Sequence, residues 1–315
     1  MMETRKIGQL DVSVIGLGGN NFGDRLDQER TTSVVNAALE SGITYIDTAD
    51  SYSAGKSEEF LGVALAGRFD QIVIATKFGS QGSADGKLSG GHPDHVRNAC
   101  EASLKRLGVS VIDHYQYHRP DPNIPIEETM GAMTELVIEG KVREIGCSNF
   151  SVDQLETSSE IAKVKGWARF ASVQNYYSIF TRDPEDGVVQ ACAQLGMALV
   201  PYFPLESGLL SGKVSSDGSA PEGSRLHQMK PAGRERFMGD KRLAAVEDLK
   251  AFAAERDHSI LELAFAYLLS EPVVASVIAG ATKPEQVEAN AAASTWRLSP
   301  DERAEVARIA SQADS

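Results

Sequence analysis

The feature that most constrains the fold of this chain is a repeated alternation of short apolar segments with segments of helical patterning. The apolar segments predict eight strands, at residues 14–17, 45–47, 72–77, 112–118, 142–148, 170–176, 198–202 and 273–278. Apolar residues at helical spacing predict helices at residues 28–40, 57–65, 93–107, 126–139, 152–164, 185–195, 241–256 and 259–269, and one that begins at residue 284. Strands that alternate with helices pair in parallel, and eight of them can close into a barrel.

We therefore predict an α/β protein in which residues 1–315 form a single (β/α)8 TIM barrel domain. A β-hairpin around the turn residue Gly8 precedes the barrel, and extra helices lie before strand eight and at the C-terminus. An open, doubly wound sheet is the alternative, but no G-x-G-x-x-G follows the first strand. Residues 204–240 break the alternation and are rich in Gly, Ser and Pro, and a loop of that length is usually functional.

Composition narrows the classes of function. A formal net charge of −13 disfavours binding to nucleic acid or to anionic lipid through a broad basic surface. No apolar run approaches the ~20 residues that cross a bilayer, and no signal-peptide pattern opens the chain, so we expect a cytoplasmic protein. The three cysteines have no C-x-x-C spacing, and the sequence predicts no metal site and no particular oligomeric state.

Polar residues stand where the predicted strands end. Taken singly they have ordinary explanations, because Asp47 could cap a loop and His118 could be a core histidine like its strand neighbour His114. In a parallel barrel, however, the C-terminal ends of all strands meet at one mouth, where active sites lie. The residues at these ends are Asp47, Tyr52, Lys77, His118, Ser148, Asn149, Gln174 and Tyr202.

Four of these residues suit the reduction of a carbonyl group. Such a reaction needs a proton donor, and an isolated phenol, with a pKa of about 10, is a poor one at neutral pH. We expect Lys77 to lower the pKa of Tyr52 and Asp47 to hold Lys77 in place. His118 can then donate a hydrogen bond that orients the substrate oxygen.

The chain resembles the aldo-keto reductases over nearly its whole length. The motifs that carry the resemblance are GLGG, DTADSY, IATKF, HRPDP, IGCSNF, VQNYYS, PYFPLESGLLSGK and GATKPEQVEAN, in this order. Each motif alone is weak, but eight in order at barrel spacing are specific. The resemblance implies a catalytic set of Asp47, Tyr52, Lys77 and His118.

The resemblance also implies a nicotinamide cofactor, NADPH with NADH as the alternative, lying across the barrel mouth. The residues that it assigns to cofactor binding are Gly19, Asn20, Asp47, Ser148, Asn149, Gln174, Tyr202, Phe203, Pro204, Leu205, Ser207, Gly208, Lys213, Arg225, Gly280, Thr282, Lys283, Gln286 and Asn290. Of these, Ser148, Asn149 and Gln174 would bond the carboxamide, and Tyr202 would stack on the ring.

The phosphates would lie at the other end of this site. Residues 204–240 would act as a cofactor-covering loop, with residues 205–213 over the pyrophosphate. Lys283 and Arg225 would attract a 2′-phosphate, and the helix that begins at residue 284 could bind a phosphate through its first N–H groups. Three residues differ from those that many relatives carry, namely Phe203, Ala279 and Gln286.

The resulting hypothesis is an NADP(H)-dependent oxidoreductase that reduces a small aldehyde or ketone. The alternative is an NADP(H)-binding sensor subunit, as in the potassium-channel β subunits, which resemble reductases but lack the strand-four histidine. His118 favours the enzyme. A third reading, a Schiff-base lyase that uses Lys77, is disfavoured because an adjacent carboxylate keeps a lysine protonated.

Overall fold

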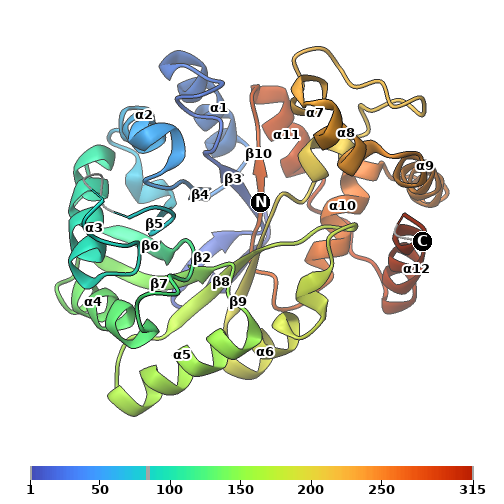
Figure 1. Ribbon diagram of the computed structural model, residues 1–315. Coiled ribbons are helices and arrows are strands. Elements are labelled where there is room, and N and C mark those ends of the chain that lie inside the picture. The colour runs from blue at the N-terminus through green and yellow to red at the C-terminus, as the bar shows by residue number, and fades with distance from the viewer. Residues whose placement is uncertain (1, 83–85, 314–315) are drawn as a thin grey trace.

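In the computed structural model, which describes residues 2–82 and 86–313, eight parallel strands form a closed barrel surrounded by helices (Figure 1). The strands follow one another around the barrel in chain order: β3 (Ile15–Gly18), β4 (Tyr45–Asp47), β5 (Val73–Phe78), β6 (Ile112–Tyr117), β7 (Val142–Ser148), β8 (Phe170–Tyr176), β9 (Ala198–Tyr202) and β10 (Val277–Gly280). Strand β10 pairs with both β9 and β3, which closes the ring. The predicted TIM barrel is confirmed.

The helices that cover the barrel follow the strands. They are α1 (Gln28–Glu40), α2 (Lys56–Ala64), α3 (Pro93–Leu107), α4 (Ile126–Ile138), α5 (Val152–Lys165), α6 (Val188–Leu195) and α11 (Pro284–Ala292). Helix α5 shows how the sequence sets these bounds. Ser151 and Gln154 form a reciprocal capping box at its start, and Gly166 ends it with a left-handed φ of 64°.

A β-hairpin closes the N-terminal end of the barrel. Strands β1 (Thr4–Ile7) and β2 (Leu10–Ser13) pair antiparallel around Gly8, as predicted. The side chains of Ile7 and Leu10 join the apolar cluster inside the barrel. Among the residues that the structure describes, these side chains cover this end of the barrel interior.

The alternation of side chains along each strand explains where the polar residues lie. In β5, Ile74 and Phe78 pack in the large core between strands and helices, whereas Ala75 belongs to the cluster inside the barrel. Lys77 is two residues beyond Ala75 and shares its inward face. In β5, the apolar Ala75 thus lies deeper in the interior and the polar Lys77 lies nearer the mouth.

The predicted bounds of strand eight differ from the observed ones. The sequence predicts residues 273–278, whereas β10 is Val277–Gly280. Val274 makes only an isolated bridge to Leu199 and closes a turn by bonding to the Glu271 carbonyl. Because the apolar run is buried whether it is turn or strand, hydrophobicity alone could not mark where pairing begins.

The long segment between β9 and β10 contains more structure than the predicted loop. Residues 204–240 include the short helices α7 (Arg225–Gln228) and α8 (Pro231–Met238). The predicted extra helices follow, α9 (Asp240–Ala254) and α10 (Ile260–Leu269) before β10 and α12 (Pro300–Ser311) near the C-terminus. Figure 1 places α7 and α8 on the same side of the barrel as α11.

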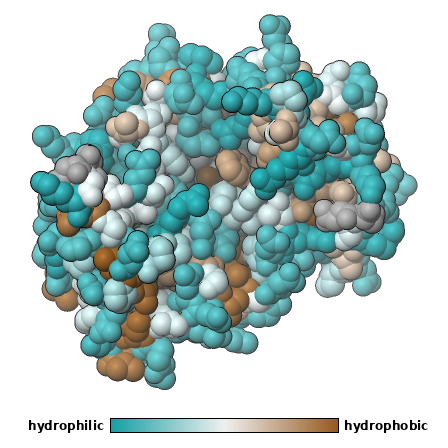
Figure 2. Space-filling model, viewed as in Figure 1, coloured by the Kyte–Doolittle hydropathy of each residue, from teal (hydrophilic) through white to brown (hydrophobic). Residues whose placement is uncertain are grey.

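The face of the molecule drawn in Figure 2 gives little sign of a large apolar docking area. The face drawn in Figure 2 is mostly hydrophilic, and its apolar residues gather in small patches. Within residues 2–82 and 86–313, no helix combines the length and the apolar character needed to cross a bilayer.

Candidate active site

Three neighbouring strands bring the predicted catalytic residues together. Asp47 ends β4, Lys77 lies near the end of β5, and His118 directly follows β6. These strands are adjacent in the barrel, with Asp47 opposite Ala75 and Lys77 opposite Gln116 in the pairing. The C-terminal ends of neighbouring parallel strands lie on the same side of the barrel. Residues at the ends of successive strands therefore lie next to one another around the mouth.

Lys77 links the acid and the phenol. Its Nζ lies 2.5 Å from Asp47 Oδ2, 2.9 Å from the carbonyl oxygen of Thr48 and 3.4 Å from Tyr52 Oη. The Lys77 side chain is fully buried and that of Asp47 is only 3% exposed. Burial opposes the charge of Lys77, but the nearby Asp47 carboxylate outweighs it, so the pKa of Lys77 is raised. Lys77 is therefore an ammonium at neutral pH.

Two glutamines hold the other oxygen of Asp47. Gln116 Nε2 and Gln174 Nε2 each lie 3.0 Å from Asp47 Oδ1, and Gln174 Nε2 also contacts Gln116 Oε1 at 3.2 Å. The sequence assigned Gln174 to the cofactor and gave Gln116 no role in the site. The available signal was spacing, because Gln116 precedes His118 by two residues and shares its inward face. These amides fix the carboxylate that positions Lys77.

Tyr52 lies on an unusual turn after β4. Ser53 and Ala54 have positive φ angles of 51° and 53°, a conformation rare for residues with a side chain. The Ser53 hydroxyl donates a hydrogen bond of 2.9 Å to the Phe22 carbonyl, which ties the turn to the loop after β3. The turn is thus held in a conformation that brings the Tyr52 hydroxyl back towards Lys77.

The pKa of Tyr52 differs from the predicted direction. Lys77 lowers it as expected, but the protein removes most of the water around the hydroxyl, and the Asp47 carboxylate adds to the cost of a phenolate. Desolvation is the larger effect, so the pKa of Tyr52 is raised above its ordinary value. The phenol is fully protonated at neutral pH and can serve as a proton donor.

His118 is neutral and lies beside the phenol. Burial lowers its pKa to about 3, with smaller contributions from the positive charges of Lys77 and Arg119. The rings of His118 and Tyr52 are 6.1 Å apart and nearly perpendicular. Asn149 Nδ2 donates to the His118 carbonyl at 3.1 Å and steadies the backbone here. A neutral imidazole has one N–H, which suits a hydrogen-bond donor to a substrate oxygen.

A cavity of about 610 Å³ opens at this mouth. It is lined by Asp47, Tyr52 and His118 of the predicted catalytic set, whereas Lys77 lies behind them. The predicted cofactor residues that line it are Asn20, Asp47, Ser148, Asn149, Gln174, Tyr202, Phe203, Pro204, Leu205, Ser207, Gly208, Lys213, Arg225, Gly280, Thr282, Lys283, Gln286 and Asn290. Gly19 is not among the lining residues; its N–H bonds the Asp47 carbonyl, and its neighbours Gly18 and Asn20 face the cavity instead.

The part of the cavity near the catalytic residues offers an amide, two hydroxyls and an aromatic ring. Tyr202 Oη donates to Asn149 Oδ1 at 2.9 Å, and Asn149 Nδ2 also contacts Ser148 Oγ at 3.0 Å. Asn149 takes a positive φ of 61°, which turns its side chain across the strand ends. The Tyr202 ring stacks on Tyr176 at 5.6 Å. This group is pre-organised to receive a flat, polar ring.

The other end of the cavity is basic. Lys213 and Lys283 line it, and α11 begins there without a side-chain cap. Its first residue, Pro284, has no N–H and the Gln286 N–H bonds the Lys283 carbonyl, which leaves the Glu285 N–H for an anion. Arg225 contacts Asn21 Oδ1 at 3.3 Å and lies over the Phe203 ring. Cations at one end and a pre-organised polar group at the other suit a dinucleotide.

Arg25, in the loop after β3, lines the cavity but was not predicted from the sequence. Arg25 Nη2 donates to the Gly223 carbonyl at 2.6 Å, and Asn21 Nδ2 donates to the Ala281 carbonyl at 3.2 Å. These bonds join the loop to residues more than 190 positions away, a pairing that local pattern cannot reveal. Arg119 also lines the cavity; its only signal in the sequence was its place beside His118.

A buried carboxylate anchors the loop over the cavity. Glu206 is fully buried and accepts hydrogen bonds from Tyr176 at 2.8 Å, Thr181 at 3.0 Å and Arg242 at 3.2 Å, and also from Ser178. No cluster of three or more metal-ligating side chains occurs among the residues that the structure describes.

Comparisons with known proteins agree with the fold and the site. The family model described as the aldo/keto reductase family matches residues 14–311. A "probable aldo-keto reductase 1" from Glycine max is 36% identical over 304 residues, which cover 96% of this chain and 85% of that protein. Aldo-keto reductase YhdN from Bacillus subtilis is 34% identical over 308 residues, covering 95% and 90%.

Solved structures show the same similarity. The holo form of aldo-keto reductase AKR11C1 from Bacillus halodurans aligns with a TM-score of 0.78 at 30% identity, covering 98% of this chain and 96% of that one. The glycerol dehydrogenase AKR11B4 from Gluconobacter oxydans aligns with a TM-score of 0.83 at 29% identity, covering 98% and 95%. A closed barrel with a polar constellation at its mouth is an enzyme architecture. This chain belongs to the aldo/keto reductase family, which makes it an oxidoreductase that uses a nicotinamide cofactor.

Proposed function

We propose that this protein is an NADP(H)-dependent oxidoreductase that reduces an aldehyde or ketone to an alcohol. The observation that carries the proposal is the Tyr52 hydroxyl, which faces the cavity 3.4 Å from the buried ammonium of Lys77. A phenol in this position can give a proton to a carbonyl oxygen, and the ammonium stabilises the phenolate that remains.

Each catalytic residue has a separate task in this proposal. A bound nicotinamide supplies the hydride that adds to the carbonyl carbon. Tyr52 donates its proton to the carbonyl oxygen as negative charge develops there. Asp47 keeps Lys77 beside the phenol, and the neutral His118 donates a hydrogen bond that orients the oxygen. Hydride and proton together account for the conversion of a carbonyl to an alcohol.

The cavity supports a dinucleotide cofactor. Asn149, Ser148 and Tyr202 would hold the carboxamide and the ring near Tyr52, which a short hydride path requires. The segment 204–240, anchored by Glu206, would cover the pyrophosphate. Lys283 and the N-terminus of α11 would bind phosphate at the far end, which favours NADP over NAD.

The geometry argues against the Schiff-base alternative. A lysine must be neutral and accessible to attack a carbonyl. The pKa of Lys77 is raised, and its ammonium lies behind Asp47 and Tyr52 rather than in the cavity wall. The sensor alternative is disfavoured because His118, which the potassium-channel β subunits lack, is present here and lies beside Tyr52 in the cavity wall.

The test is an oxidation assay with NADPH and with NADH against a panel of aldehydes, ketones and quinones. We expect the cofactor to be oxidised in proportion to alcohol formed, and faster with NADPH. Tight NADPH binding without oxidation across the panel, together with a stable protein partner in pull-down, would instead identify a sensor subunit.

A further inference from the structure

One cation in the cavity wall has no function in the site described so far. Arg119 directly follows His118 and lines the cavity, and its side chain is exposed. It makes no hydrogen bond or ion pair with any residue that the structure describes. An exposed arginine is usually only solvated, but this one is adjacent in sequence to a residue that faces the reacting group.

Arg119 lies far from the predicted phosphate end of the cavity. In the closed order β10-β3-β4-β5-β6-β7-β8-β9, strand β6 is four places from β10 in either direction. Arg119 follows β6, whereas Lys283 and α11 follow β10. Arg119 and Lys283 therefore lie on opposite sides of the mouth. A cofactor phosphate held by Lys283 would lie away from Arg119.

The charge of Arg119 reaches the reacting end. It contributes, after burial and Lys77, to the lowered pKa of His118. Burial raises the pKa of Tyr202, and the positive charge of Arg119 opposes this rise with a smaller effect. His118 lies beside the Tyr52 ring and both line the same cavity as Arg119, so an anion bound by Arg119 would be close to the carbonyl that Tyr52 protonates.

The cavity as a whole favours anions although the protein is acidic. Five basic side chains line it, Arg25, Arg119, Lys213, Arg225 and Lys283, against three acidic ones, Asp47, Glu222 and Glu285. Asp47 is already neutralised by Lys77. Arg25 and Arg225 are engaged in bonds between loops. The charge of Arg225 also acts on Tyr52, but Arg225 bonds Asn21, whereas Arg119 has no partner among the described residues.

We propose that Arg119 determines substrate specificity by pairing with a carboxylate or phosphate group carried by the carbonyl substrate. This inference rests on the proposed carbonyl reduction and names the substrate class for it. The planar guanidinium can donate two parallel hydrogen bonds to either anion, which makes the pairing selective as well as attractive. The neighbouring His118 is neutral and remains free to contact the carbonyl oxygen.

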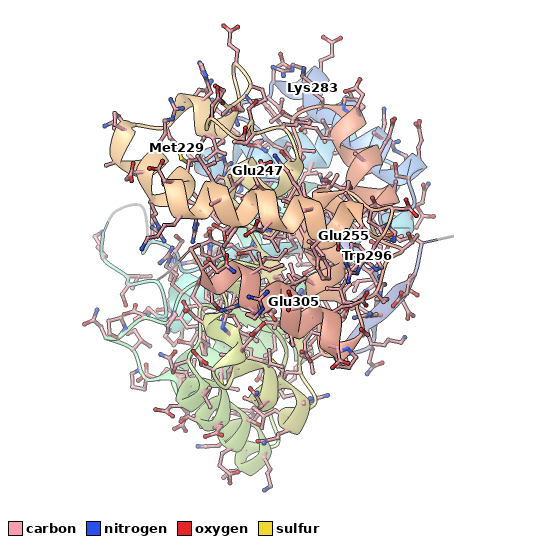
Figure 3. The ribbon with its side chains drawn as sticks, turned by 90° about the vertical axis from the view of Figure 1, so that its right-hand side faces the viewer. Met229, Glu247, Glu255, Lys283, Trp296 and Glu305 are labelled. Atoms are coloured by element: carbon pink, nitrogen blue, oxygen red, sulfur yellow. The ribbon has the colours of Figure 1, made fainter. Side chains whose placement is uncertain are left out.

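The test compares matched substrates that differ in charge. The pairs are 4-carboxybenzaldehyde with 4-methylbenzaldehyde and glyceraldehyde 3-phosphate with glyceraldehyde, assayed with NADPH on wild-type protein and on Arg119→Gln. The matched control is Arg308→Gln, which removes the same charge from α12, outside the cavity. Its ion-pair partner Glu305 lies on α12, away from Lys283 (Figure 3).

We expect the wild type to prefer the charged substrate in at least one of the two pairs. The pair in which this preference appears shows whether Arg119 binds a carboxylate or a phosphate. Arg119→Gln should reduce kcat/KM for that substrate by about tenfold or more, through KM, as loss of a charge-assisted bond implies. Turnover of the neutral aldehydes and the Kd for NADPH should stay as in Arg308→Gln.

Other results would overturn the inference in distinguishable ways. Turnover of neutral aldehydes without any preference for charge would leave the reductase proposal standing and refute the role of Arg119. A weaker Kd for NADPH in Arg119→Gln would show that Arg119 binds the cofactor instead. No oxidation of NADPH with these aldehydes or with any ketone or quinone of the panel would refute the reductase proposal and this inference with it.

Discussion

At the scale of single residues, the site depends on an ion pair placed where water is excluded. Removing two charges from water costs free energy, which the hydrogen bonds to both charged groups offset. Asp47 accepts from Lys77, Gln116 and Gln174, and Lys77 also donates to the Thr48 carbonyl. Removing one partner of such a pair lowers the stability of a protein more than replacing both partners by apolar residues. The pair can therefore be tested by measuring stability.

Replacing Asp47 alone should destabilise the protein. In Asp47→Asn the ammonium of Lys77 stays buried without its counter-charge, and the free energy of unfolding should fall by about 3–5 kcal/mol. Chemical denaturation followed by circular dichroism measures this. The double variant Asp47→Asn/Lys77→Met should recover most of the loss while remaining inactive. An unchanged unfolding midpoint in the single variant would contradict the account.

The pH dependence follows from two shifted groups. The raised pKa of Tyr52 keeps it protonated through neutral pH, so carbonyl reduction should be flat there and fall only above about pH 10. Alcohol oxidation needs the phenolate and should rise with pH instead. His118, with a pKa of about 3, is neutral over this range and should add no inflection near its ordinary pKa. Profiles of kcat/KM in both directions test this, and a step near neutrality that disappears in His118→Asn would count against it.

At the scale of elements, the turn after β9 is held in a conformation that its residues do not favour. Phe203, Glu206 and Ser207 have positive φ angles of 55°, 48° and 60°. Residues with side chains adopt this region at a cost, so the turn persists because its surroundings impose it. The hydrogen bonds of the buried Glu206 supply that constraint.

Removing this anchor should weaken cofactor binding more than the chemical step. In Glu206→Ala we expect the Kd for NADPH to rise by about tenfold, equivalent to about 1.4 kcal/mol, because ordering of the turn must accompany binding. Isothermal titration gives the Kd, and saturating NADPH should restore most of kcat. Glu247→Ala on the outer surface of α9 is the matched control (Figure 3). Equal affinity in both variants would show that Glu206 does not organise the site.

At the scale of the whole molecule, barrel topology explains why the site was readable from sequence. Strands β4, β7, β8 and β9 have the predicted bounds, and their order along the chain is their order around the mouth. Residues at the ends of strands that follow one another in the sequence are therefore neighbours at the mouth, as Asp47, Lys77 and His118 are.

What the sequence could not provide depends on contacts across strands and on burial. The bonds from Gln116 to Asp47 and from Arg25 to Gly223 join residues with no local pattern in common. The direction of the Tyr52 pKa was also mispredicted, because an attraction to Lys77 is visible from residue type whereas loss of water is not. The balance between attraction to a neighbouring charge and loss of water can be judged only when the packing around the group is known.

Whether Tyr52 delivers the proton can be measured with the variant Tyr52→Phe. The substitution removes only the hydroxyl, so the protein should fold and bind NADPH with a Kd close to that of the wild type. Its kcat for carbonyl reduction should fall by about 10²–10⁴-fold, the usual contribution of a general acid. Wild-type turnover by a folded, NADPH-binding Tyr52→Phe would contradict the account.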